Sequence, residues 1–175
     1  GSIETIRYYD IDDCGTVEVI PNTPLSPQCF FKLNKDKNGK PIGTFTKYII
    51  GKNPSGHGMA VGDIDGDGKV EIILQSGYLK QNKGVYDKWV KVNAYECSVK
   101  YASVPMQVYD VNSDGIADII YGNAHGYGLF WLEQKKDGSF IEHVIDMAAA
   151  QYHDLWLVDI DCDGELELVT GKRYR

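Results

Sequence analysis

Four acidic clusters with a common spacing are the residues of this sequence best suited to chemistry. The clearest copy has three alternating acids, a glycine and a final acid: Asp63, Asp65, Asp67, Gly68 and Glu71. Alternating carboxylates on a tightly bent loop converge on one point, where a hard cation is needed to hold them. Calcium fits better than magnesium, because it accepts many oxygen ligands in loose geometry. For any single copy, a solvated acidic turn is the alternative, since Asp and Gly are common turn residues.

The same pattern occurs four times, about every 50 residues. Two further copies have a full set of oxygen ligands, namely Asp110, Asn112, Asp114 and Asp118, then Asp159, Asp161, Asp163 and Glu167. The first copy has Asp10, Asp12 and Glu18 but places Cys14 at the third acidic position. A reduced thiol is a poor calcium ligand, so we expect this loop to bind weakly or not at all. Ca²⁺ is therefore the expected cofactor, and regular repetition makes chance matches improbable.

Short β-prone runs flank every acidic loop, as 59–61 and 72–74 do around the second. A calcium-binding EF-hand would have helices on both sides and its last acid at loop position 12, whereas here the last acid is at position nine. The predicted strands are 3–9, 16–20, 28–33 and 44–50; 57–62, 70–75, 85–92 and 94–101; 106–109, 117–122, 128–134 and 139–145; 155–158 and 165–170. Residues 147–150 are predicted to join two units, with a single helical turn as the alternative.

This grouping predicts an all-β fold, a β-propeller of four-stranded antiparallel blades. The repeats are approximately 3–50, 57–101, 104–146 and 153–175, and the last is incomplete. Together they make residues 1–175 a single propeller segment of about three and a half blades.

The pattern Asp-x-Asp-x-Asp-Gly-x-x-Asp/Glu between two short strands resembles the FG-GAP/VCBS repeats. These repeats form propellers in integrin α-subunits and in bacterial and fungal carbohydrate-active proteins. The resemblance covers essentially the whole chain, and it implies calcium at the three complete loops. It also implies a ring of seven or eight blades, so we expect a missing segment or a partner chain to complete the propeller. The family includes adhesion, lectin-like binding and sugar chemistry, and the resemblance does not choose among them.

Composition excludes several classes of partner. The chain has 175 residues and a net charge of −7, and it contains no basic stripe that would neutralise nucleic-acid phosphates. No apolar run is long enough for a membrane span, and no signal peptide is present in this chain. The four cysteines (Cys14, Cys29, Cys97 and Cys162) match neither a zinc spacing nor a dense disulfide framework. From the resemblance we expect an extracellular, cell-surface or periplasmic location.

Hairpin geometry predicts a second polar face opposite the acidic loops. Each loop joins the first two strands of a unit at one end, so residues before the first strand and after the second lie at the other end. His57 and His153 both enter there, six residues before the first acid of their loops, and the exits are 75–83, 123–127 and 172–174. The candidate ligand-binding residues are His57, His125, Tyr127, His153, Lys172, Arg173 and Tyr174.

Two functions follow from this polar face. The first is a calcium-stabilised module of a secreted or surface protein that binds a glycan or a protein, with Arg173 pairing a carboxylate or sulfate. The alternative is part of a carbohydrate-active enzyme, of the polysaccharide lyase or sugar dehydratase type, with His57, His153 and Arg173 as candidate catalytic residues. A purely structural adhesion module is a third. Each histidine has a simpler interpretation as a partly buried hydrogen-bonding residue, and Trp131 and Trp156 are predicted to be core residues rather than sugar platforms.

Overall fold

The computed structural model describes residues 3–172, and every regular element in that range is a β-strand. The first sheet consists of β1 (Ile6–Tyr9), β2 (Glu18–Pro21), β3 (Pro27–Lys35) and β4 (Pro41–Pro54). The second consists of β5 (Met59–Gly62), β6 (Glu71–Leu74), β7 (Ser76–Lys80) and β8 (Val90–Glu96). The third consists of β9 (Gln107–Tyr109), β10 (Asp118–Gly122), β11 (Tyr127–Gln134) and β12 (Phe140–Ala150), and the fourth of β13 (Tyr152–Val158) and β14 (Glu167–Lys172). All pairs are antiparallel between strands adjacent in the chain.

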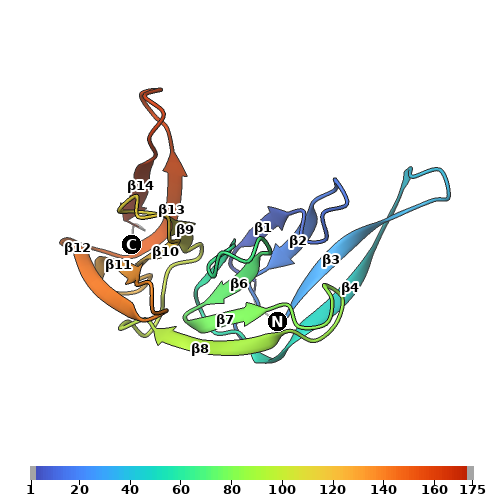
Figure 1. Ribbon diagram of the computed structural model, residues 1–175, viewed down its shortest axis with the longest axis horizontal. Coiled ribbons are helices and arrows are strands. Elements are labelled where there is room, and N and C mark those ends of the chain that lie inside the picture. The colour runs from blue at the N-terminus through green and yellow to red at the C-terminus, as the bar shows by residue number, and fades with distance from the viewer. Residues whose placement is uncertain (1–2, 173–175) are drawn as a thin grey trace.

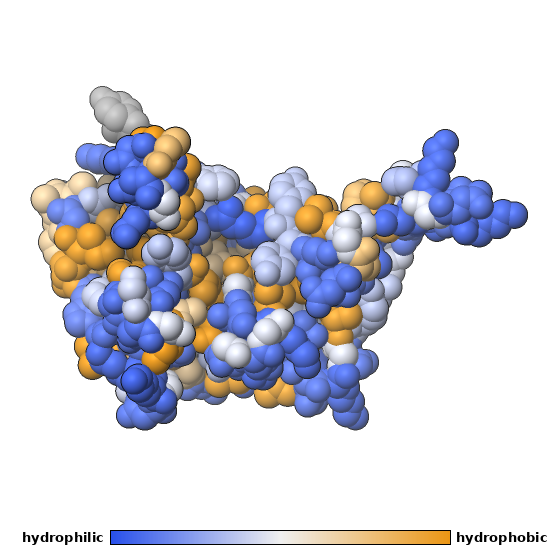
Figure 2. Space-filling model, turned by 45° about the horizontal axis from the view of Figure 1, so that its top comes forward, coloured by the Kyte–Doolittle hydropathy of each residue, from blue (hydrophilic) through white to orange (hydrophobic). Residues whose placement is uncertain are grey.

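The four sheets follow one another along an open arc (Figure 1). The first strand of each sheet contacts the first strand of the next, in the order β1, β5, β9 and β13, so these strands line the inside of the arc. The long β3–β4 hairpin projects away from the arc in Figure 1, and its tip is strongly hydrophilic in Figure 2. The expected all-β architecture of four-stranded antiparallel sheets is therefore confirmed for these residues.

Hydrophobic cores lie between successive sheets. Ile20 and Phe30 of the first sheet pack in one cluster with Ile72 of the second. A second cluster joins the second and third sheets, and a third cluster joins the third and fourth. The second and third sheets approach closely at Gly62, where an added Cβ would lie only 2.8 Å from the side chain of Val108.

The outer strands of the second sheet differ from the prediction. Strands were expected at 85–92 and 94–101, but the third strand is β7 and the fourth is β8. Gly77 makes the early start of β7 possible, because its φ of +65° suits glycine and a Cβ there would overlap the carbonyl of Val92. Trp89 is buried and donates its backbone N–H to Ile50 O at 3.0 Å. The apolar residues of 85–92 therefore reflect packing against the first sheet rather than a strand over that whole range.

Two smaller expectations are also wrong. Residues 147–150 do not form a junction, because β12 extends to Ala150. Trp156 is 54% exposed rather than a core residue, and the Arg7 guanidinium lies 5.2 Å from its ring centroid. Residues 3–172 contain no helix that is long and apolar enough to cross a membrane. The four cysteines are free, with Cys29 and Cys97 buried.

Candidate metal loops and a histidine cluster

The four acidic loops share one hydrogen-bonding pattern. The first acid of each loop accepts the backbone N–H of the residue five positions later, as Asp63 does from Gly68 at 2.9 Å and Asp110 from Gly115 at 2.8 Å. The first and fourth loops repeat this bond at 2.6 and 3.1 Å. Because one carboxylate closes each loop in the same way, the repeated sequence pattern corresponds to a repeated conformation.

The last acid of each loop turns back toward the loop and accepts the N–H that follows the first acid. Glu71 accepts from Ile64 at 3.1 Å, and the equivalent bonds in the other loops are 2.8 to 3.1 Å long. Glu18, Glu71 and Asp118 are completely buried. A buried carboxylate has lost its hydration and needs hydrogen bonds or a positive charge instead. The partners of each last acid therefore show whether a cation fits that loop.

In the second loop the residues fit a bound cation. Asp63, Asp65 and Glu71 each place a carboxylate oxygen within 4.8 Å of the other two. Within residues 3–172, Glu71 Oε1 is buried without a hydrogen-bond partner. Burial raises the pKa of Glu71 to about 7, and the neighbouring carboxylates of Asp65 and Asp67 add to this shift. A calcium ion would supply the positive charge that this carboxylate lacks.

The third and fourth loops differ from each other. In the fourth, Asp159, Asp161 and Glu167 form the same close group as in the second loop. In the third, both oxygens of Asp118 accept backbone N–H groups, from Val111 and Gln134. Three carboxylate oxygens of the third loop do not gather within 4.8 Å of one another among the described residues. The reason is that Asn112 places an amide where the other loops have a carboxylate, with its Oδ1 accepting the backbone N–H of Asp114 at 3.1 Å.

Two lysines that sequence reasoning missed lie against the acidic loops. Lys32 of β3 donates to Asp12 and, at 3.1 Å, to Glu18 Oε1. Burial alone would raise the pKa of Asp12, but the hydrogen bonds from Lys32 and Tyr86 hold it well below its usual range. Lys80 of β7 pairs with Asp65 and Asp67. Lys80 belongs to the segment 75–83 that was predicted for the opposite face, and this part of the prediction is wrong.

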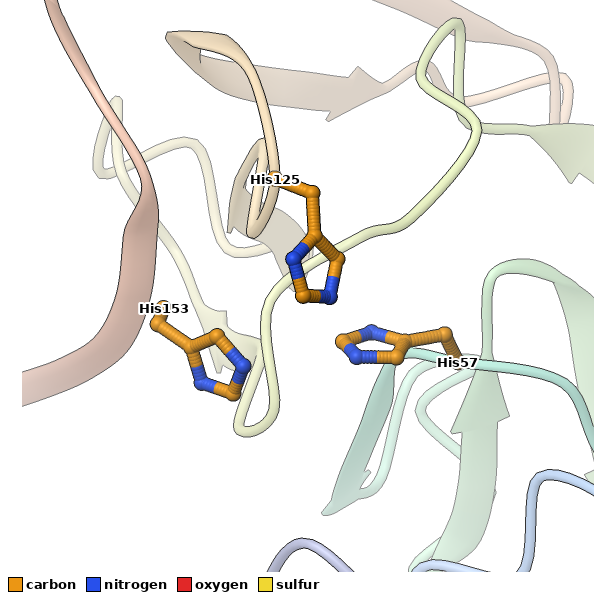
Figure 3. A group of neighbouring side chains, drawn as sticks. All are labelled: His57, His125 and His153. Carbon is orange, nitrogen blue, oxygen red and sulfur yellow. The ribbon is translucent and has the colours of Figure 1, made fainter. Parts of the chain in front are cut away.

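At the other end of the sheets, His57, His125 and His153 come together (Figure 3). His57 precedes β5, His125 lies in the β10–β11 turn, and His153 lies near the start of β13. The ring centroids are 5.2 to 5.7 Å apart, and the rings meet edge to face. Six residues of extended chain, about 20 Å, separate His153 from the first acid of its loop.

His57 is the most buried member of this histidine cluster, with 8% of its side chain exposed. Its Nδ1 bonds to the carbonyl oxygen of Ala102, and its Nε2 lies 2.6 Å from Glu4 Oε2. Glu4 Oε2 is also 3.9 Å from His153 Nε2. Glu4 was missed, although a signal existed: it stands six residues before Asp10, the position that His57 and His153 occupy in their own repeats.

An open cleft of about 770 Å³ adjoins the cluster. Its lining includes Glu4, His57, Gln75, Lys91, Lys100, Tyr101 and His125. Lys172 lies with His153 in a separate hollow, and Tyr127 is 62% exposed beside the β10–β11 turn. Arg173 and Tyr174 lie outside the described residues.

Comparison with known families supports the repeat assignment. Residues 110–170 match the FG-GAP-like repeat, a span that includes the third and fourth acidic loops together with His125 and His153. This match confirms the expected resemblance to FG-GAP repeats. No curated protein matches the chain.

Proposed function

We propose that the chain is a calcium-stabilised β-propeller module of a secreted or surface protein, and that it binds an acidic glycan in the cleft beside the histidine cluster. Three observations support this: the succession of antiparallel sheets along an arc, the FG-GAP-like match, and the acidic loops, two of which lie within the matched span. In such a module each sheet is one blade, and the inner strands surround the ring axis.

The orphaned carboxylate oxygen of Glu71 is the single observation that best supports calcium. An ionised carboxylate buried without a partner would be costly, and calcium bound by Asp63, Asp65 and Glu71 would remove that cost. The metal would act on stability rather than on the ligand, because these loops lie at the opposite end of the strands from the cleft.

The lining of the cleft favours an anionic sugar. Lys91 and Lys100 provide positive charge, while the amide of Gln75 is bonded to the backbone of Val99, Lys100 and Ala102 and holds that segment beside the cleft. Tyr101 is 38% exposed, with the ammonium of Lys100 lying 5.1 Å from its ring centroid. A partly exposed aromatic ring next to a cation suits a sugar that presents one apolar face and one carboxylate.

Calorimetry with uronate-containing and matched neutral oligosaccharides tests this proposal. We expect binding of the acidic series only, weakened several-fold by Lys100→Ala and by higher salt. Lys37→Ala, at the exposed tip of the β3–β4 hairpin, is the matched control. Equal binding of both series, or equal effects of the two variants, would contradict an acidic glycan.

Glu4 and His57 favour a second candidate, the carbohydrate-active enzyme. A carboxylate 2.6 Å from a histidine nitrogen beside an open cleft is suited to proton transfer. If the module is a lyase, new unsaturated ends will appear when acidic polysaccharide is incubated with the protein. Loss of that product with retained binding in the His57→Ala, His153→Ala double variant would support the enzyme, and no product from the parent protein would reject it.

A further inference from the structure

The three histidines lie on three different sheets, and their ring nitrogens converge on one point. One nitrogen from each of His57, His125 and His153 lies within 4.8 Å of the other two. Nitrogens that share a tetrahedral ion at about 2.0–2.1 Å are roughly 3.4 Å apart. Small rotations about the side-chain torsions would therefore bring these rings to coordination distance (Figure 3).

The tautomer of His57 is fixed by its surroundings. The carbonyl oxygen of Ala102 can only accept a hydrogen bond, so Nδ1 must be the protonated nitrogen. In the neutral ring, Nε2 then has a free lone pair. In histidine metal sites, one imidazole nitrogen usually donates to a backbone carbonyl or a carboxylate while the other nitrogen binds the metal.

The Nε2 atom of His57 also lacks a hydrogen bond. It is buried, and no hydrogen-bond partner is found for it within residues 3–172. Glu4 Oε2 lies 2.6 Å away, but its direction is not that of a hydrogen bond. A lone pair and a carboxylate oxygen repel each other unless positive charge lies near both. A proton on His57 Nε2 would pair that ring with Glu4, whereas a single metal ion would also bind the nitrogens that His125 and His153 bring to the same place.

We propose that His57, His125 and His153 form a binding site for one divalent transition metal of the zinc type, with Glu4 beside its open coordination position. Neutral imidazoles are ligands for zinc, copper and nickel rather than for calcium, so the site is chemically distinct from the acidic loops. Three histidines with a fourth position open to the adjoining cleft are typical of sites where a metal binds water or substrate. Glu4 would accept a hydrogen bond from water bound at that position.

Metal titration in saturating calcium tests this site. The acidic loops are then occupied, and zinc alone is the probe, followed by cobalt, whose visible absorption reports coordination by histidine nitrogen. We expect one zinc ion per chain. Binding should be at least about 100-fold weaker in His125→Ala, since removing a group that only hydrogen-bonds a metal ligand already costs about 10–100-fold in affinity. His125 is exposed, so this change should leave the fold intact, which circular dichroism would verify.

His143 is the matched control, because it is the remaining histidine and pairs with Glu133 in the third sheet, outside the cluster. His143→Ala should keep both the zinc affinity and the cobalt spectrum of the parent protein. Glu4→Gln should keep the metal but change the cobalt spectrum and its pH dependence. Absence of stoichiometric zinc binding, or equal losses in His125→Ala and His143→Ala, would overturn the proposal. Glycan binding is measured separately, so either proposal can fail without the other.

Discussion

Lys32 Nζ lies 3.1 Å from Glu18 Oε1, within the first acidic loop, where the repeat would otherwise place a calcium ion. The same ammonium pairs with Asp12 and lies 3.3 Å from Cys14 Sγ. Lys32 therefore brings positive charge to the last acid of its own loop, whereas Lys80 reaches Asp65 and Asp67 but leaves Glu71 Oε1 without a partner in the described residues. This contact gives a physical reason to expect little calcium at the first loop, in addition to the substitution at Cys14.

Replacing this ammonium should make the first loop dependent on calcium. Lys32→Met leaves the buried Glu18 and Asp12 without a counter-charge, and breaking a buried pair in this way costs about 3 kcal/mol. We expect this loss in the free energy of unfolding, measured in urea with chelator present. Added calcium should then stabilise Lys32→Met more than it stabilises the parent protein. Lys80→Met, which removes more exposed pairs with Asp65 and Asp67, should cost less than about 1 kcal/mol. Equal stability of Lys32→Met and the parent protein would refute this account.

Calcium should bind to the individual acidic loops in separate events. Asp65→Ala and Asp161→Ala each remove an oxygen ligand from a close group of three, so each should abolish one binding event in calorimetry. Chelator should lower the melting temperature of the parent protein, because each pair of carboxylates about 4 Å apart repels by about 4 kcal/mol at an effective dielectric near 20. Glu165→Gln is the matched control, since it removes an exposed charge from the fourth loop without touching the close group. A chelator-independent melt would argue against calcium.

The buried Glu71 should make the calcium-free protein less stable as the pH rises, which is the opposite of the usual effect of a paired carboxylate. Its pKa rises from 4.5 to about 7 in the folded state, so the folded state binds the proton more tightly than the unfolded chain. The resulting stabilisation is fully present below about pH 4.5 and is lost as the pH rises through about 7. Urea unfolding in chelator should therefore show falling stability over this window, and Glu71→Gln should flatten the slope. Calcium should remove the fall in stability, because it binds the ionised carboxylate. If Glu71→Gln kept the same slope, Glu71 would not be the group responsible.

The contact between the second and third sheets should tolerate no added methyl group at Gly62. A Cβ there would lie 2.8 Å from Val108, and overpacking of this kind costs about 1–3 kcal/mol. We expect Gly62→Ala to lower the free energy of unfolding in urea by that amount, and to lower the urea midpoint accordingly. Gly171→Ala is the control, because a Cβ at Gly171 meets no atom within 4 Å. Similar midpoints for the two variants would show that the sheets can separate at little cost.

Much of the fold could be predicted from the repeat, because each acidic loop fixes the two strands beside it. The strands far from a loop were harder. β7 begins two residues after β6 ends, and only the special conformation of Gly77 permits this, which no apolar pattern reveals. The run 85–92 looks like a strand because it is apolar, but the burial of Trp89 reflects packing between sheets.

The site residues that occupy a repeated position could be predicted. Those that reach the acidic loops from other strands through long side chains could not. His57 and His153 share a repeat position, and hairpin geometry correctly places them at one end with His125. Glu4 shares that position too but was not predicted, because a single acid outside the repeated loops belongs to no recognisable motif. Lys32 and Lys80 reach the acidic loops from third strands, 14 and 9 residues after the last acid of their loops. Contacts of that kind have no spacing rule.

The position six residues before each first acid holds Glu4, His57, Val104 and His153 in the four repeats. Each repeat thus contributes one side chain at this position, while the acidic loop of the same repeat lies at the far end of the strand. In the proposed module, ligand binding and calcium-dependent stability would therefore be carried by opposite ends of each repeat. A substitution at this position would alter the polar face of the proposed module without changing any residue of the acidic loops. Val104, which is buried in the hydrophobic core between the first and second sheets, is the member of this set that carries no polar group.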